Sequence, residues 1–182
     1  MNLWHDVEAG DDVPNVINVI VEIPKGSQNK YEYDKKLNII RLDRVLFSPF
    51  HYPGDYGLLP RTLSADGDPL DALVLVTNPT HPGVLIKSRP IGMLTMRDVG
   101  KTDNKILCVP KYDPRFDEYG DVTDLEEHLL KEIAHFFGVY KELEQKKVKM
   151  ISWKNAAEAK KVIMKSIRRY DEKYGSKEPS TG

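Results

Sequence analysis

The chain has 182 residues, a length that fits one compact domain with its own core. Its 40% hydrophobic and 30% charged residues exclude a mostly disordered chain. Because 27 basic and 28 acidic residues give a net charge of -1, we expect no general attraction to nucleic acid or to an anionic membrane.

Short strands are predicted over the first two thirds of the chain. Val16–Ile23 is rich in β-branched residues and alternates, which places Glu22 on one face with Asn18 and Ile20. Further strands are expected at Lys30–Asp34, Leu37–Arg41, Arg44–Phe47, Ala72–Val76, Val84–Met96 with a break at Pro90, and Lys105–Val109. Short strands separated by turns favour a closed or nearly closed barrel, because closure removes exposed strand edges.

Two helices are predicted in the last third. Thr123 and Glu126 have the spacing of a capping box, and apolar residues then recur at helical spacing as far as Leu143. A second helix is expected from near Asn155 to a stop at Gly175. Since strands come first and helices last, we predict the α+β class, with one domain over residues 1–175 and a loose tail over 176–182.

The sequence also predicts a cytoplasmic protein without a membrane segment. Its one cysteine, Cys108, excludes an internal disulfide framework and a cysteine-based zinc cluster. Residues 1–12 carry acids and no apolar core, unlike a signal peptide. The longest uncharged stretch, Ala72–Ile86, is interrupted by Asn78 and two prolines and is shorter than the roughly 20 residues of a membrane helix.

Three carboxylates crowd one short segment, Asp66–Asp71. Like charges this close repel one another unless a cation is present, and oxygen ligands in a turn suit a hard divalent ion such as Mg²⁺. Gly67 lets the backbone turn and Pro69 fixes its φ angle, so the side chains of the segment can converge. The same composition is equally typical of a solvated turn.

A second acidic pair, Asp98 and Asp103, is followed by Lys105 and could add ligands to the same metals. Residues 98–104 are also compatible with a plain polar hairpin connection. Neither acidic segment decides the function by itself.

Cations and phenols gather at the predicted strand ends and on the first predicted helix. They are Lys30, Arg44, Tyr52, Tyr56, Tyr140 and Lys141. Arginine can grip a phosphate with two donors, lysine supplies a point charge, and a tyrosine hydroxyl donates without adding charge. Opposite carboxylate-held Mg²⁺, such groups suit a phosphate ester or anhydride. A tyrosine and a lysine on a helix, such as Tyr140 and Lys141, are more often a core and a solvent-facing residue.

Segment Asp66–Asp71 matches the D-x-D-P-x-D signature of the soluble family I inorganic pyrophosphatases, and the chain resembles that family from about Asn15 to Tyr170. Further blocks that resemble it are Val21–Pro24, Lys30–Glu32, Asp43–Arg44, Tyr52–Pro53, Asp55–Gly57, Arg89–Gly92, His135–Phe137 and Tyr140–Lys141. The compact length resembles the prokaryotic branch. The resemblance implies a five-stranded OB-like closed β-barrel flanked by two C-terminal α-helices, and a homohexamer.

The resemblance also implies roles for the acids. Asp66, Asp71 and Asp103 match ligands of two activating metals, with Asp71 bridging them. Asp98 and Glu22 match ligands of metals that arrive with the substrate. Two further acids complete the set. Glu32 matches an acid that contacts the metal ligands but not the metals, and Asp68 matches the group that interacts with the nucleophilic water.

Substrate contacts are implied for the cations and phenols. Lys30 and Tyr56 match contacts to the attacked phosphate; Arg44, Tyr140 and Lys141 match contacts to the leaving phosphate; Lys105 and Tyr52 match supporting positions. One departure stands out, because many relatives carry an acid directly after the position of Asp98, where this chain has Val99. That difference concerns the number and affinity of the metals rather than the reaction.

The implied reaction is the hydrolysis of inorganic pyrophosphate to two phosphates by a metal-activated water, without a covalent enzyme intermediate. It implies several Mg²⁺ ions per subunit, with Mn²⁺ or other divalent ions as substitutes. Two alternatives stay open. Another metal-dependent phosphohydrolase would act on nucleotides or polyphosphate. An OB-type nucleic-acid binder would need exposed aromatic residues over a basic groove, where this sequence has acids.

Overall fold

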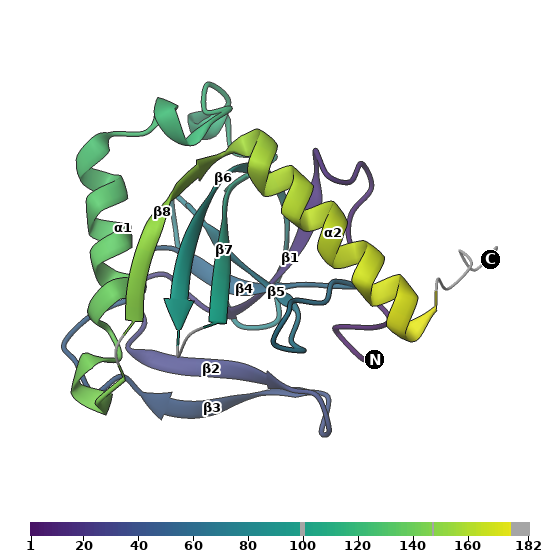
Figure 1. Ribbon diagram of the computed structural model, residues 1–182, viewed down its shortest axis with the longest axis horizontal. Coiled ribbons are helices and arrows are strands. Elements are labelled where there is room, and N and C mark those ends of the chain that lie inside the picture. Colours follow the sequence, from purple (N-terminus) through teal and green to yellow (C-terminus); the bar gives the residue numbers. More distant parts are fainter. Residues whose placement is uncertain (99–100, 147, 176–182) are drawn as a thin grey trace.

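A computed structural model describes residues 1–98, 101–146 and 148–175 of the chain (Figure 1). The strands are β1 Ile17–Ile23, β2 Asn29–Asp34, β3 Ile39–Val45, β4 Asp55–Leu59, β5 Leu70–Val74, β6 Leu85–Asp98, β7 Lys101–Pro110 and β8 Val148–Asn155. The helices are α1 Glu127–Val139 and α2 Ala156–Tyr174, with short 3-10 helices η1 Pro114–Phe116, η2 Val122–Asp124 and η3 Glu142–Glu144. The tail predicted to be loose, 176–182, lies outside the described residues.

Six strands form one sheet in the order β1-β4-β5-β7-β6-β8, and an additional pairing of β1 with β6 closes five of them into a ring. β5 and β7 pair in parallel, and the other pairs in this sheet are antiparallel. β2 and β3 form a separate two-stranded sheet, which lies beneath the ring in the view of Figure 1. The predicted α+β class is confirmed, although β8 stands between the two helices.

Several strand predictions need correction. The two strands expected at Leu37–Arg41 and Arg44–Phe47 are one continuous strand, β3. β4 was not predicted because its five residues include Asp55 and Gly57, which are untypical of strands, and no β-branched residue. β8 was not predicted either, because polar and apolar residues do not alternate regularly along it.

The two helices differ in how well their starts are signalled. Asn155 caps α2 by accepting a hydrogen bond of 3.0 Å from the backbone N–H of Glu158, as predicted, and Gly175 ends the helix at φ +78°. The capping box expected at Thr123 is wrong. It belongs to Asp121 and Asp124 around η2, and α1 begins only at Glu127.

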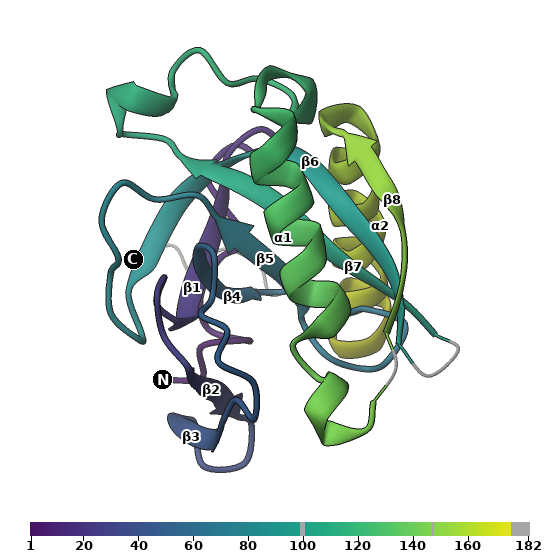
Figure 2. The ribbon, with the colours of Figure 1, turned by 90° about the vertical axis from the view of Figure 1, so that its left-hand side faces the viewer.

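The helices cover opposite faces of β6 and β7, as Figures 1 and 2 show. Neighbouring residues of a strand point to opposite faces, and they accordingly belong to different core clusters. Leu94 and Leu107 pack in the cluster that contains Phe137 of α1, whereas Met93 and Ile106 pack in the cluster that contains Ile163 of α2. No helix among residues 1–98, 101–146 and 148–175 is long and apolar enough to cross a bilayer.

Closure of the ring depends on a close approach of β4 to β1 at Gly57. A Cβ atom placed on Gly57 would lie 1.9 Å from the backbone oxygen of Ile20, which no side chain can relieve. We expect Gly57→Ala to lower the free energy of unfolding by about 1–3 kcal/mol or more, because the two strands must separate. Urea unfolding measures this change.

Gly138→Ala in α1 is the matched control, because a Cβ at Gly138 meets no atom within 4 Å. It should raise stability by roughly 0.5–1 kcal/mol through helix propensity. Equal stability of Gly57→Ala and the wild type would show that the close approach does not constrain the fold.

Candidate active site

A cavity of about 450 Å³ lies between the β2–β3 hairpin, one end of the ring and the residues that follow α1. Of the predicted site residues, those that line it are Glu22, Lys30, Glu32, Tyr52, Tyr56, Asp66, Asp68, Asp71, Asp103, Lys105, Tyr140 and Lys141. Two predicted residues are not among them. Arg44 stands beside the lining, and the side chain of Asp98, at the end of β6, lies outside the described residues, as does Val99.

Strand register explains why the acids meet. Asp71 of β5 lies directly opposite Lys105 of β7 in the parallel pair. Asp103 shares a face with Lys105 because side chains alternate along a strand with a period of two. Asp103 was expected in a loop and is instead part of β7. Two irregularities in strand pairing, at Glu22 and beside Lys30, turn further side chains toward the cavity.

Lys105 stands between two carboxylates. Its Nζ atom lies 2.5 Å from Asp71, 2.9 Å from Asp103 and 2.7 Å from the hydroxyl of Tyr56, to which it donates. Burial works to lower the pKa of Lys105, but the two carboxylates outweigh it and the pKa is raised. Lys105 is therefore a fixed positive charge inside the acidic cluster.

Lys105 does not fully compensate the negative charge of the neighbouring carboxylates. Burial raises the pKa of Asp103, the neighbouring Asp71 raises it further, and Lys105 opposes both. Burial, followed by repulsion from Asp71, raises the pKa of Glu22 to about 8, although Glu22 accepts a 2.6 Å hydrogen bond from the backbone N–H of Tyr33. Buried carboxylates that resist ionisation in this way favour the arrival of a further cation.

The donor set fits divalent metal ions. Asp66, Asp71, Asp103 and Glu22 present carboxylate oxygens to one cavity, and such oxygens are the ligands that Mg²⁺ and Mn²⁺ prefer. Within residues 1–98, 101–146 and 148–175, no three His, Cys, Asp or Glu side chains already converge on one ion position. Binding of an ion would therefore require the carboxylates to turn toward it.

Phenols of the cavity are anchored in the core. Tyr52 and Tyr140 pack against Phe136, with ring centroids 4.8 and 5.1 Å apart. Burial raises the pKa values of Tyr52 and Tyr56 well above their usual range, so both keep their protons. Tyr140 and Lys141 were predicted on the first helix, but α1 ends at Val139 and both residues follow it. The ring of Tyr140 is nevertheless buried while the residue lines the cavity, so a core role and a place in the cavity are compatible.

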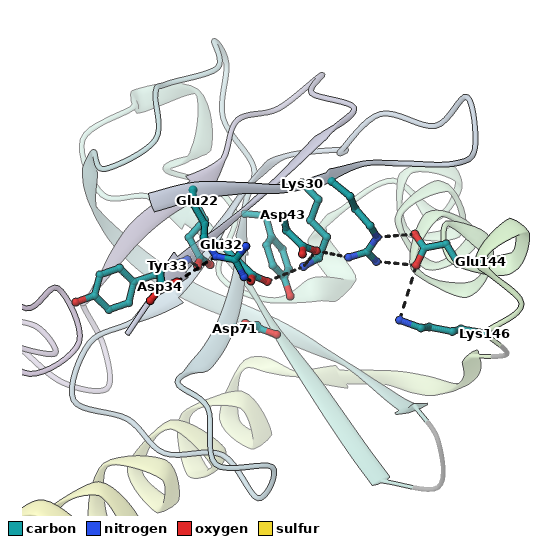
Figure 3. A network of polar contacts seen from close by, with 12 residues as sticks. Glu22, Lys30, Glu32, Tyr33, Asp34, Asp43, Asp71, Glu144 and Lys146 are labelled. Carbon is teal, nitrogen blue, oxygen red and sulfur yellow. Dashed lines mark hydrogen bonds and ion pairs between the residues drawn. The ribbon is translucent and has the colours of Figure 1, made fainter. Parts of the chain in front are cut away.

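A chain of charged side chains continues from the cavity along the hairpin (Figure 3). Lys30 lies 3.5 Å from Glu32 and 3.5 Å from Asp43. Asp43 contacts Arg44, and Arg44 binds Glu144 at 3.0 and 2.7 Å. Glu144 was not predicted, because it is 100 residues from Arg44 and no local pattern links them.

Lys35 was also missed. It lies in the turn between β2 and β3, lines the cavity, forms an ion pair with Asp68, and lies 5.1 Å above the ring of Trp4. A lysine in a hairpin turn is ordinarily solvated, so its residue type gave no signal.

Acids suited to divalent cations face lysines and tyrosines suited to phosphate oxygens across one cavity, which defines the class of metal-dependent phosphohydrolases. A family model described as inorganic pyrophosphatase matches residues 19–171. An inorganic pyrophosphatase of Geobacillus stearothermophilus is 52% identical over 157 residues, which cover 86% of this chain and 95% of that protein. One of Halobacterium salinarum is 47% identical over 174 residues, which cover 95% and 98%.

The crystal structure of inorganic pyrophosphatase from Thermus thermophilus is similar as well. Its TM-score is 0.91 at 44% identity, over 94% of this chain and 99% of that chain. The chain therefore belongs to the inorganic pyrophosphatase family, and its reaction is the hydrolysis of inorganic pyrophosphate.

The charge balance of the acidic cluster is testable through Lys105. Lys105→Met leaves the half-buried Asp71 and Asp103 without their partner, so we expect a loss of about 1–3 kcal/mol of unfolding free energy in EDTA. Mg²⁺ should restore part of this loss, because a bound cation replaces the missing charge. Urea unfolding in EDTA and in Mg²⁺ measures both effects, and an equal loss in the two buffers would contradict the proposed use of these acids.

Proposed function

We propose that the chain hydrolyses pyrophosphate in this cavity, by direct attack of a metal-activated water and with Mg²⁺ as the ion, which Mn²⁺ can replace. One observation carries the proposal: acids from four separate segments meet in a cavity that also holds lysines and tyrosines. A cavity with acids alone would suit a structural cation, and one with cations alone would suit any anion. The pairing of both suits a charged phosphoric anhydride.

The acids would divide the work by their position. Asp66, Asp71 and Asp103 would hold the activating ions, and Glu22 with Asp98 would hold ions that accompany the substrate. When bound, such ions lower the pKa of a water molecule and balance the charge of phosphate oxygens.

Asp68 would orient the attacking water or accept its proton. Its side chain is 59% exposed, so water can reach it. Its backbone N–H donates a 3.0 Å hydrogen bond to Asp66, which fixes the turn between them.

Lys30 and Tyr56 would hold the attacked phosphate, and Arg44, Tyr140 and Lys141 the leaving one, with Lys105, Tyr52 and Glu32 supporting them. The protonated hydroxyl of Tyr56 can donate to a phosphate oxygen without adding charge.

Attack by water, rather than by a side chain, is supported by the lining of the cavity. The described residues that line it include no serine, threonine, cysteine or histidine. The one thiol, Cys108, is fully buried, and burial raises its pKa, so it stays protonated. The carboxylates, lysines and tyrosines of the lining would be engaged as metal ligands or phosphate contacts in the proposed arrangement, so water is left as the attacking group and no covalent enzyme intermediate is expected.

We also propose that the closed ring is an OB-like barrel and that the chain assembles as a homohexamer in the cytoplasm. Support for assembly comes from the resemblance to prokaryotic members and from apolar side chains exposed along β3 and just after it, among them Ile39, Leu42, Val45 and Phe47. Sedimentation analysis would measure the assembly directly.

A phosphate-release assay tests the proposed function. With Mg²⁺, we expect phosphate release from pyrophosphate, far less from ATP and tripolyphosphate, and none from any of them in excess EDTA. Faster release from ATP or tripolyphosphate would favour the alternative phosphohydrolase. Undiminished release in EDTA would exclude the metal requirement.

Two acid-to-amide variants separate the proposed roles. Asp71→Asn should lose most Mg²⁺ affinity and most turnover, because it removes a bridging charge. Asp68→Asn should keep Mg²⁺ affinity and lose about a hundredfold or more in kcat, the usual scale for a group that moves a proton. Titration calorimetry with Mg²⁺ and steady-state kinetics measure the two properties.

Asp117→Asn is the matched control, because Asp117 is exposed and lies outside the cavity. It should leave both properties unchanged. Unaltered turnover and metal affinity in the Asp71 and Asp68 variants would refute the assignment.

A further inference from the structure

Glu144 belongs to η3, the short helix that follows α1, and its side chain is only 5% exposed. Its two carboxylate oxygens accept from Nε and Nη2 of Arg44 at 3.0 and 2.7 Å. This is the bidentate geometry that fixes both the position and the plane of a guanidinium group. A carboxylate this buried lowers the stability of the fold unless a cation is held against it.

The contacts leave part of Arg44 available. Arginine has five N–H donors. Glu144 uses one on Nε and one on Nη2, and Asp43 uses one on Nη1. Within the described residues, one donor on each of Nη1 and Nη2 therefore has no protein acceptor. Two donors on adjacent nitrogens can bind two oxygens of one phosphate.

The same turn carries both Glu144 and the proposed substrate contacts. Tyr140 and Lys141 line the cavity, and the backbone N–H of Glu144 donates 3.0 Å to the carbonyl of Lys141. In the hairpin, Arg44 lies opposite Lys30 in the β2–β3 register, and Lys30 lines the cavity. The ion pair of Glu144 with Arg44 thus joins the hairpin to the turn after α1 (Figure 3).

We propose that Glu144 is a positioning residue that orients the Arg44 guanidinium toward the leaving phosphate and holds the hairpin at a fixed distance from Tyr140 and Lys141. This inference rests on the proposed function, because it takes Arg44 as a substrate contact. Glu144 itself touches no substrate. Glu144 acts on catalysis only through Arg44. Substitution of Glu144 should therefore have no effect on catalysis once Arg44 is replaced by a residue without a planar guanidinium group.

A purely structural ion pair is the competing explanation. Both explanations place the pair in a partly buried setting, with Lys146 3.9 Å from Glu144 and Lys30 3.5 Å from Asp43. They differ in what a substitution changes. Removal of a purely structural pair lowers the unfolding temperature and leaves kcat/KM of the folded protein unchanged, whereas removal of a positioning residue lowers kcat/KM of the folded protein and does so only through its partner.

The experiment is a double-mutant cycle with Glu144→Gln and Arg44→Lys in saturating Mg²⁺. Gln keeps the size of Glu but offers one acceptor in place of two. We expect Glu144→Gln to lower kcat/KM for pyrophosphate about tenfold or more, the scale of a lost charge-assisted hydrogen bond. Arg44→Lys should lower it at least as much, because a point charge cannot replace a planar fork.

In the Arg44→Lys background, adding Glu144→Gln should cost less than about twofold, since residues that act as one unit are not additive. Titration calorimetry with inorganic phosphate should show the same non-additive pattern for product affinity. Glu142→Gln is the matched control, because this neighbouring acid of η3 is exposed. It should leave kcat/KM and phosphate affinity unchanged.

Thermal unfolding is recorded for each variant. If Glu144→Gln does not fold, Glu144→Asp keeps the charge on a shorter side chain, and it should show a smaller loss of kcat/KM that again disappears in the Arg44→Lys background. Multiplicative losses in the double variant, an unchanged kcat/KM, or a higher kcat/KM on removal of Glu144 would overturn the inference. Absence of pyrophosphate hydrolysis by the wild type would instead refute the proposed function.

Discussion

Repulsion among buried carboxylates is the constraint on which this structure depends. Asp71 and Asp103 share the single ammonium group of Lys105, while Glu22 resists ionisation beside them. The described lining of the cavity holds six acids and four lysines, so an excess of negative charge remains. In the proposed function, bound cations would compensate this excess, which accords with the tendency of perturbed charged groups to gather at functional sites.

Strand pairing brings these carboxylates together in one cavity. The parallel pairing of β5 with β7 sets Asp71 beside Lys105, and alternation along β7 brings Asp103 to the same face. The β2–β3 hairpin, outside the ring, supplies the opposing cations. Ring and hairpin meet through side-chain contacts, and the ion pair of Arg44 with Glu144 joins the hairpin to the end of α1. The geometry of the cavity therefore depends on long-range contacts more than on any single loop.

Much of this could be read from the sequence, for physical reasons. Alternation predicted β1 and the Asn155–Gly175 limits predicted α2, because both signals are local. The acids of Asp66–Asp71 were identifiable because crowded like charges need an explanation. β4 was not predicted because Asp55 and Gly57 are untypical of strands and the segment has no β-branched residue, and the cap at Asp121 was not predicted because Thr123 offers a similar pattern nearby. Arg44 with Glu144 could not be predicted, since only the tertiary fold makes them neighbours.

Anomalous diffraction from crystals grown with Mn²⁺ and a non-hydrolysable pyrophosphate analogue tests the central claim most directly. We expect anomalous peaks within bonding distance of the Asp66, Asp71 and Asp103 carboxylates, with the analogue between those peaks and Lys30. Peaks confined to acids elsewhere on the surface, or an analogue bound away from this cavity, would contradict it.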